Sequence, residues 1–405
     1  MQLIIQKFGG TSVGNIERIK NVAKIIINEI KQGNKVVVVV SAMAGVTNSL
    51  ISLAQQLLDL NNITNLQEYD TILSTGETVA AASLSLELQR LNIKARSMQG
   101  WQIPIKTNDS FAESLVTDID KHVLNELVKN NTVPVITGFQ GVTKNGYVTT
   151  LGKGGSDISA ALIAAKLQAD RLDIYTDVTG VFTADPRIIH NTSKLDTISQ
   201  EEMLALSSSG AKLLHERAAL AILRYRLNVQ ILSSFDNISG TTITTAKKTV
   251  NKQGKKMENK LVTAITSDKN ILKIDIDCQD NSSKIYQYLA KEQLPLEQIK
   301  SDGNKLTIMS HLNQKHKFIT SLEELKKQTI IRNYTVNTNI ATVTLVGYGI
   351  KSDRSLCWKL IDILSKIEVT ALTIDISEIK ATILVNDTDN EKVIKTLHDY
   401  FIPIP

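Results

Sequence analysis

Short apolar runs alternate with amphipathic segments through residues 1–245. Residues 36–40 are all valine, and such a β-branched run is typical of a strand covered on both faces, as in a parallel sheet. Residues 133–137 and 172–176 form similar runs. Over 16–30, apolar residues recur on one helical face. This alternation predicts a doubly wound α/β domain with a mostly parallel sheet, in which ligands bind at the carboxyl ends of the strands.

The C-terminal part of the chain repeats one order of predicted elements. Strand, helix, strand, strand and helix patterns follow one another over 271–277, 283–293, 296–300, 306–311 and 317–327. The same order returns over 342–346, 356–367, 372–376, 381–385 and 391–400. A repeat of about 70 residues with this order predicts paired ferredoxin-like modules of the βαββαβ type. We expect them at 263–335 and 336–405. Neither carries an obvious catalytic constellation, which indicates regulation, dimerisation or both.

Charge argues against a nucleic-acid partner. Residues 246–262 are polar and rich in lysine, and we interpret them as a solvated linker rather than a binding patch. The formal net charge is +5, but 36 lysines stand against 10 arginines. That ratio disfavours nucleic-acid recognition, because arginine is the preferred base reader.

The 405-residue chain is long enough for two or three domains. Its 2 cysteines, Cys278 and Cys357, are too few for a disulfide scaffold and fit no zinc spacing. No apolar run approaches the roughly 20 residues that span a membrane. The start of the chain breaks into glycines too early for a secretory signal. We therefore expect a reducing, cytoplasmic location.

A glycine-rich turn follows the first predicted strand, residues 3–6. It reads Lys7-Phe8-Gly9-Gly10-Thr11-Ser12. Here the backbone can approach an anion closely, a helix N-terminus supplies free N–H groups, and Lys7 adds a positive charge. The lysine precedes the glycines, unlike in a Walker A motif, and there is no GxGxxG fingerprint. The alternative is a simple turn with Thr11 or Ser12 as the helix N-cap.

A second glycine-rich loop with a lysine opens another helix. Residues 151–157 read Leu-Gly-Lys-Gly-Gly-Ser-Asp, and an alanine-rich helix is predicted over 158–167. Asp157 has the alternative role of a helix N-cap. Two such loops in one α/β domain could form opposite sides of a single polyphosphate site.

Three further segments carry candidate binding residues. Ser41 opens the small, hydroxyl-rich stretch 41–48 after the valine strand, which either lines a ligand cleft or is a plain strand-to-helix turn. Glu77, in Ser-Thr-Gly-Glu, could hold a substrate ammonium or favour the dipole near a helix start. Residues 175–187 bring acidic and basic groups together after a strand. They fit either a nucleotide site or turn chemistry at Asp185-Pro186.

Several catalytic motifs are absent from the sequence. The 6 histidines show no zincin spacing, there is no GxSxG elbow, and no Cys–His pair can be argued from spacing. Phosphate-type loops without a nucleophile indicate phosphoryl transfer, in which a protein mainly positions reactants and neutralises charge.

Taken together, these motifs resemble the aspartate kinases of the amino acid kinase family. The matching stretches are KFGGTSVGN at 7–15, VVSAMAGVTN at 39–48, TGE at 75–77, TLGKGGSDISAA at 150–161, DIYTDVTGVFTADPR at 173–187, SGAKLLH at 209–215 and GTTI at 240–243. The C-terminal repeat resembles the paired ACT regulatory modules of this family, and Ser377-Glu378-Ile379-Lys380 matches a stretch of the second module. The resemblance covers nearly the whole chain. Members of this family sometimes carry the first module as an insertion within the second, so the boundary at 335 is provisional.

The resemblance implies an activity and a set of site residues. ATP would transfer its γ-phosphoryl group to the side-chain carboxylate of L-aspartate, giving 4-phospho-L-aspartate, the first intermediate toward lysine, diaminopimelate, threonine and methionine. Lys7 would lie against the transferring phosphates, and Asp157 would organise the site, directly or through water. Aspartate would be bound by Ser41, Thr47, Glu77 and Lys153, with Glu77 taking the ammonium. Mg²⁺ would bridge the phosphates with few direct protein ligands. The nucleotide site would be formed by Lys7, Phe8, Gly9, Gly10, Thr176, Asp177, Phe182, Arg187, Lys212 and Leu213.

The resemblance also implies a homodimer formed through the ACT modules, with feedback inhibition by lysine, threonine or both. The loops at 277–281 and 347–354 lack the glycine or proline-glycine usual in ACT effector sites, so we expect one or both sites to bind poorly. In the catalytic half, Lys153 replaces an arginine that holds the substrate carboxylate. Since lysine offers only a point charge on a flexible stem, we expect weaker aspartate binding. Phe182 replaces a common tyrosine, and Glu216 replaces a proline.

Other functions stay open at this point. One is an amino acid kinase acting on glutamate or on a nucleoside monophosphate, against which Thr47, Glu77 and the ACT pair argue. Another is a catalytically silent protein that binds nucleotide or amino acid, which the intact Lys7 and Asp157 disfavour. A nucleic-acid-binding protein is the least favoured, since no recognition helix or aromatic platform is visible.

Overall fold

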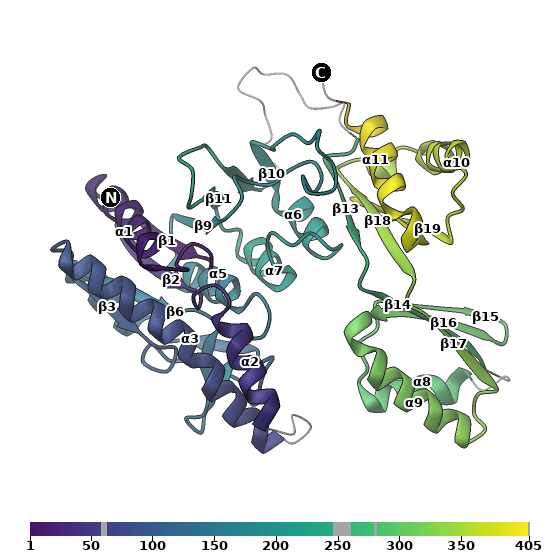
Figure 1. The fold of residues 1–405 in the computed structure, drawn as a ribbon, viewed down its shortest axis with the longest axis horizontal. Coiled ribbons are helices and arrows are strands. Elements are labelled where there is room, and N and C mark those ends of the chain that lie inside the picture. Colours follow the sequence, from purple (N-terminus) through teal and green to yellow (C-terminus); the bar gives the residue numbers. More distant parts are fainter. Residues whose placement is uncertain (58–62, 246–260, 279–281, 404–405) are drawn as a thin grey trace. The chain divides into compact units, whose positions relative to one another are not determined.

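The N-terminal unit is built on an eight-stranded sheet in the order β10-β12-β11-β9-β1-β2-β6-β3 (Figure 1). In this computed structural model, residues 1–57, 63–245, 261–278 and 282–403 are described. All neighbouring strands run parallel except β11 and β12. The strands are β1 (Leu3–Phe8), β2 (Lys35–Val40), β3 (Ala95–Met98), β6 (Val133–Thr137), β9 (Arg171–Thr176), β10 (Thr197–Ser199), β11 (Val229–Ser233) and β12 (Thr241–Thr244).

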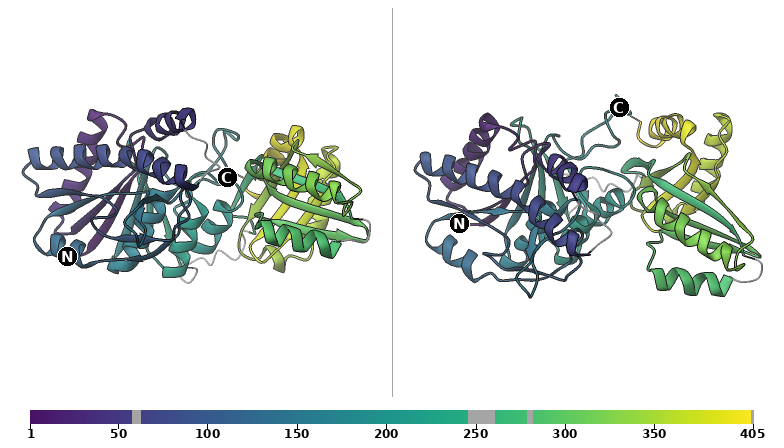
Figure 2. Two further views of the ribbon diagram at one scale, coloured as in Figure 1. Left: turned by 90° about the horizontal axis from the view of Figure 1, so that it is seen from below. Right: turned by 60° about the horizontal axis from the view of Figure 1, so that its bottom comes forward.

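Helices cover both faces of this sheet. On one face, α1 (Ile16–Lys31) and α3 (Ile63–Arg90) pack on Phe8, Val38 and alternate neighbours along the strands. Val37 and Val39 point to the other face, where α5 (Gly155–Leu167) contacts β1, β2 and β9. The layering can be followed in Figure 2. The remaining helices of the unit are α2 (Val46–Leu57), α4 (His122–Lys129), α6 (Gln200–Ser207) and α7 (Glu216–Tyr225).

The run of valines is therefore buried on both faces, as its composition predicts. All five valines of β2 are at most 4% exposed, and side chains alternate between the two helical layers along the strand. The predicted doubly wound α/β class is confirmed for this half of the chain.

A small second sheet in the order β5-β4-β7-β8 lies in the same unit. The strand β8 of this sheet ends directly before the second glycine-rich loop, which connects it to α5. Its strands are β4 (Ile105–Thr107), β5 (Val116–Ile119), β7 (Gln140–Val142) and β8 (Val148–Thr150).

The second unit contains two four-stranded sheets, each with a pair of helices. Figure 1 shows the sheet β15-β16-β14-β17 with α8 (Ser282–Glu292) and α9 (Lys315–Lys327). Ile274 and Phe318 are buried in the core that these elements share. The sheet β13-β18-β20-β19 packs with α10 (Leu356–Lys366) and α11 (Asn390–Phe401). Its strands are β13 (Ala264–Asp268), β18 (Ile340–Val346), β19 (Thr373–Ile376) and β20 (Lys380–Asn386). The strands of the other sheet are β14 (Ile271–Asp277), β15 (Gln298–Asp302), β16 (Lys305–His311) and β17 (Asn333–Asn337).

The two modules are not arranged in series. The strand β13, which precedes the first module, pairs antiparallel with β18 of the second. The first module, 271–337, is thus inserted between two strands of the second. The expected boundary at 335 falls inside β17, because that strand completes the first sheet by pairing with β14.

The division between the two units also differs from the expected boundary at 245. Residues 183–192 and 209–211 belong to the second unit. Ala184 and Ile189 are buried in its core, and Thr183 accepts a hydrogen bond from Ile265 of β13. The expected linker, 246–262, lies outside the described residues except for its last two. Of these, Val262 belongs to the same core. Within the described ranges, every helix is too short or too polar to cross a membrane.

Candidate active site

The predicted glycine-rich turn and the stretch after the valine strand lie at one edge of the large sheet. The central strands β1, β2, β6, β9 and β11 run parallel, so their carboxyl ends share that edge. Backbone hydrogen bonds join the segments that follow these strands. Gly9 donates to the carbonyl of Tyr175 at 3.1 Å, and Ala44 donates to the carbonyl of Gly10 at 3.1 Å.

Lys7 and Asp157 form an ion pair at this edge, with 2.6 Å between Nζ and Oδ1. Phe8 faces α1 and α3, so the alternation of side chains turns Lys7 toward the opposite face, where α5 carries Asp157. The two side chains are 10% and 13% exposed. The pair thus joins the first predicted glycine loop to the helix that follows the second, and each side chain keeps only a small exposed fraction.

The first glycine-rich turn approaches its neighbour closely. A Cβ on Gly10 would lie 2.7 Å from the carbonyl oxygen of Ala42, so only glycine fits there. The alternative that Thr11 or Ser12 caps the following helix is wrong. The N-cap of α1 is Asn15, whose side chain accepts from the backbone N–H of Arg18 at 2.9 Å. Thr11 and Ser12 therefore remain in the turn.

The second glycine-rich loop enters α5 through a left-handed residue. Gly154 is the N-cap of α5 with φ +72°, and a Cβ on it would lie 2.3 Å from the Cβ of His215. Asp157 is in the first turn of α5 and not at its N-cap, so the N-cap role considered for it is wrong. Lys153 is exposed at the tip of this loop.

Glu77 is a buried carboxylate that contacts the segment after β2. It lies well inside α3 rather than near a helix start, which removes the helix-dipole alternative. Its Oε1 accepts from the backbone N–H of Ala42 at 3.0 Å. Its Oε2 is buried and has no hydrogen-bond partner among the described residues. Burial, opposed by the bond from Ala42, raises the pKa of Glu77 to about 7.

The other expected aspartate ligands belong to the same segment as Ala42. The backbone N–H of Ser41 donates to the carbonyl of Phe8 at 3.1 Å, which fixes the start of the segment beside β1. Thr47 is the second residue of α2, and both side chains are partly exposed.

The expected nucleotide residues are distributed unequally. The Phe8 ring is fully buried and stacks on Tyr175 with 4.7 Å between ring centroids, which leaves only its backbone for a ligand. Thr176 ends β9, and its hydroxyl donates to Asp177 at 3.1 Å. Phe182 forms a β-bridge with Lys194.

Arg187 is not part of the N-terminal unit. It belongs to residues 183–192 of the second unit and pairs with Asp185 at 2.7 Å. Lys212 and Leu213 lie in the segment before α7. That segment runs into His215, which packs against Gly154.

Two residues at this site were missed by sequence reasoning. Asp70 of α3 accepts hydrogen bonds from Thr150 and Ala112. Arg217 of α7 donates to the carbonyls of Leu151 and Ser114. The spacing of Asp70 and Glu77, seven residues apart in one helix, was the available signal, because it places both on one helical face. No comparable signal marks Arg217.

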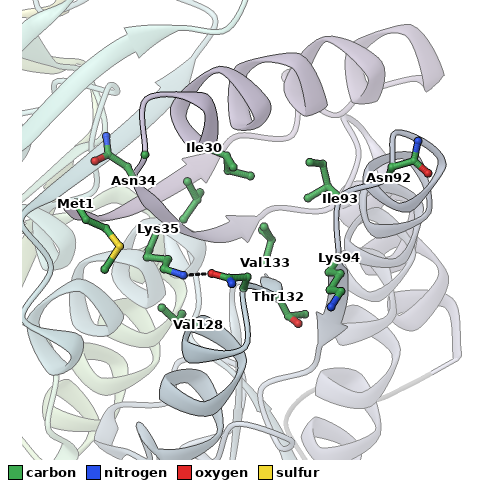
Figure 3. A pocket seen from close by; sticks show the side chains of 13 residues that line it. Met1, Ile30, Asn34, Lys35, Asn92, Ile93, Lys94, Val128, Thr132 and Val133 are labelled. Atoms are coloured by element: carbon green, nitrogen blue, oxygen red, sulfur yellow. Dashed lines mark hydrogen bonds between the residues drawn. The ribbon is translucent and has the colours of Figure 1, made fainter.

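A cavity of about 420 Å³ lies at the opposite edge of the sheet (Figure 3). Its lining includes Lys35 and Val133, the first residues of β2 and β6. None of the expected site residues lines it. The cavity is therefore separate from the candidate active site.

Comparison with known proteins gives one consistent family. Residues 2–233 match the model of the amino acid kinase family. The chain is 44% identical to an aspartokinase of Rickettsia conorii over 413 residues, covering 99% of each chain. It is 35% identical to aspartokinase 2 of Bacillus subtilis, covering 99% of this chain and 98% of that one.

Solved structures agree with the fold. The structure of Escherichia coli aspartokinase III in complex with aspartate and ADP superposes with a TM-score of 0.80 at 24% identity, covering 98% of this chain and 99% of that one. Clostridium acetobutylicum aspartate kinase superposes with a TM-score of 0.75 at 25% identity, covering 98% and 100%. The chain belongs to the amino acid kinase family.

Proposed function

We propose that the protein is an ATP-dependent aspartate kinase that forms 4-phospho-L-aspartate. The observation that carries the proposal is the Lys7–Asp157 ion pair, which joins the end of β1 to the first turn of α5 with 2.6 Å between Nζ and Oδ1. The full-length relatives named aspartokinase support the choice of acceptor. The product is the first intermediate toward lysine, diaminopimelate, threonine and methionine.

The reaction needs charge neutralisation and no general base. A side-chain carboxylate oxygen of aspartate attacks the γ-phosphorus, and the bond from that phosphorus to the β,γ-bridging oxygen breaks. The electron pair leaves with ADP. Because the acceptor is already ionised at neutral pH, no proton has to be removed. Lys7 balances the charge on the transferring phosphoryl oxygens, and Asp157 holds the Lys7 ammonium in place.

In this proposal the ammonium group and a carboxylate group of aspartate are each bound by a side chain of opposite charge. Glu77 takes the ammonium on its buried Oε2, which has no hydrogen-bond partner among the described residues. Lys153 takes a carboxylate from the tip of the second loop, and Ser41 and Thr47 line the space between. Burial of the Glu77 carboxylate strengthens its attraction for a cation, since the local dielectric is low.

ATP would be held by the backbone of Gly9 and Gly10 together with Lys7. Further nucleotide contacts are proposed for residues of the N-terminal unit, namely Phe8, Thr176, Asp177, Phe182, Lys212 and Leu213. Mg²⁺ would accompany the phosphates and neutralise their charge. Asp157 offers the kind of oxygen ligand that this ion takes in addition to phosphate and water.

We further propose a homodimer through the ACT-like modules and a cytoplasmic location. The free thiols of Cys278 and Cys357 suit a reducing compartment. Kinases for glutamate or a nucleoside monophosphate, and a catalytically silent binding protein, are the competing functions. Trapping of the product with hydroxylamine distinguishes an aspartate kinase from each of them.

Hydroxylamine trapping tests the reaction. Pure protein with Mg-ATP, L-aspartate and hydroxylamine should yield aspartyl hydroxamate, and parallel reactions with glutamate or without an acceptor should not. Lys7→Met should lower kcat by about 100-fold, because a cation at the transferring group is lost. Lys35→Met, at the far edge of the sheet, is the matched control and should keep its rate. ATP binding without any hydroxamate would favour the silent binding protein or a kinase with a different acceptor.

The raised pKa of Glu77 predicts how aspartate binding responds to pH. Glu77 must be ionised to hold an ammonium, and its pKa is about 7. The ionised fraction therefore rises with pH, and KM for aspartate should fall by about tenfold between pH 6 and pH 8. Glu77→Gln should raise KM and abolish this pH dependence, measured by ADP release. Glu29→Gln, a buried glutamate of α1, should retain it. A pH-independent KM in the wild-type protein would contradict the assignment.

Lys153→Arg should strengthen aspartate binding. A guanidinium can grip the carboxylate with two hydrogen bonds, so KM for aspartate should fall by about fivefold while KM for ATP stays constant. Lys166→Arg, at the other end of α5, is the matched control. An unchanged or higher KM in Lys153→Arg would remove Lys153 from the acceptor site.

The regulatory proposal is tested with lysine and threonine separately. At least one should inhibit the reaction and, at about 100 times its Kd, raise Tm by about 2–4 °C through preferential binding to the folded state. Glycine serves as the control amino acid. If neither lysine nor threonine changes the rate or Tm, feedback control is excluded.

A further inference from the structure

We propose that Asp70 is a positioning residue that fixes the second glycine loop relative to Glu77 and thereby sets the length of acceptor that the site takes. The proposal rests on the proposed function for the identity of the acceptor. The placement of the loop by Asp70 stands on hydrogen-bond geometry alone.

Asp70 is completely buried, and both of its carboxylate oxygens accept hydrogen bonds. Oδ1 accepts from the hydroxyl of Thr150 at 2.6 Å, and Oδ2 accepts from the backbone N–H of Thr150 at 2.9 Å. The backbone N–H of Ala112 lies 3.1 and 3.0 Å from the two oxygens. All three partners donate here, and two of them are backbone N–H groups that cannot accept. A carboxylate satisfies this arrangement, whereas the NH₂ of a side-chain amide would have to face one of these backbone N–H groups.

This carboxylate is costly to bury. Burial raises the pKa of Asp70, and only hydrogen bonds from Thr150 and Ala112 oppose that rise. An apolar residue in a helix facing the core would avoid this cost. A buried carboxylate that binds successive groups of one strand end, by contrast, holds that strand end in a defined place.

The group that Asp70 binds leads directly into the proposed acceptor loop. Thr150 is the last residue of β8, and Lys153 follows three residues later. From α7, Arg217 donates to the carbonyl of Leu151 at 2.5 Å and to that of Ser114 at 2.9 Å. Asp70 and Arg217 therefore each bind the start of the loop and the neighbouring segment 112–114. The base of the loop is held by two charged side chains from two different helices.

The same helix carries the proposed ammonium site. Asp70 and Glu77 are separated by seven residues of α3, about two helical turns or 10 Å of rise. Between them, the carbonyl of Ser74 accepts a hydrogen bond from the side chain of Gln140. One helix thus contacts the segment after β2 through Glu77 and the base of the second loop through Asp70. The distance between the proposed ammonium site at Glu77 and the base of the second loop is therefore set by α3, which is a rigid element.

Asp70→Asn tests this role, with Asp173→Asn as the matched control. Asp173 is also fully buried with a pKa raised by burial, but it pairs with Arg171 at 2.7 Å rather than with a loop. Each variant is compared with the wild-type full-length protein. The measurements are KM for aspartate, KM for ATP, the preference for aspartate over glutamate, Tm, and hydrogen exchange of the amides in 150–157.

In Asp70→Asn, one N–H would face another at Thr150 or Ala112. KM for aspartate should rise by about tenfold while KM for ATP changes less than about twofold. The preference for aspartate over glutamate should fall by a similar factor, and amides in 150–157 should exchange faster. Asp173→Asn should lower Tm without any of these changes. If Asp70→Asn fails to fold, Thr150→Val replaces it in the test. This variant removes one hydrogen-bond donor to Asp70 while keeping the shape of the side chain, and it should show the same changes to a smaller extent.

Wild-type values of both the aspartate KM and the exchange rates in 150–157 would overturn the proposal. Equal changes in Asp70→Asn and Asp173→Asn would also overturn it, because they would reveal a general loss of stability. If the wild-type protein makes no hydroxamate from aspartate, the proposed function fails. The exchange measurement still decides whether Asp70 holds the loop.

Discussion

The candidate site depends on one ion pair, between Lys7 and Asp157. Lys7 lies near the end of a central strand, where a largely buried ammonium group requires an anionic partner. Its side chain points to the α5 face of the sheet, where Asp157 pairs with it at 2.6 Å. Asp157 can occupy that place only because Gly154 turns the chain through a left-handed conformation into α5. The loop before α5 is in turn held by Asp70 and Arg217. One ion pair thus depends on strand alternation, a glycine turn and two helices.

Buried polar groups perform a second task in this unit, which is to hold the loops in place. Apolar packing of α3 against β2 and β6 fixes the distance between the layers, but it specifies poorly which loop residue lies opposite which helical turn. Hydrogen bonds from Ala42 to Glu77 and from Thr150 to Asp70 supply that register. The proposed acceptor site, which uses three separate segments, requires this register, since small displacements weaken phosphoryl transfer strongly.

Much of the fold could be predicted from local patterns. The valine run, the alternation around it and the repeated order of elements in the C-terminal half correspond to β2, the layered α/β unit and the two modules. The insertion of one module into the other could not be predicted from these patterns, because β13 and β18 are joined only by pairing across more than seventy residues. The glycine loops of the site were readable as motifs. The roles of Asp70 and Arg217 depend on contacts between distant segments and left little trace in local sequence.

The segment 183–192 bears on whether the catalytic half is an autonomous fragment. The hydroxyl of Thr183 lies 3.0 Å from Nε2 of His398, its carbonyl accepts from Ile265, and Ala184 and Ile189 fill the core around β13 and β18. A truncation at 245 would leave these apolar side chains without their neighbours and the Thr183 carbonyl without its donor. Residues 183–192 therefore belong to the core of the second unit although they lie within the kinase half of the sequence, so we expect a fragment that ends at 245 to be less soluble than the full chain.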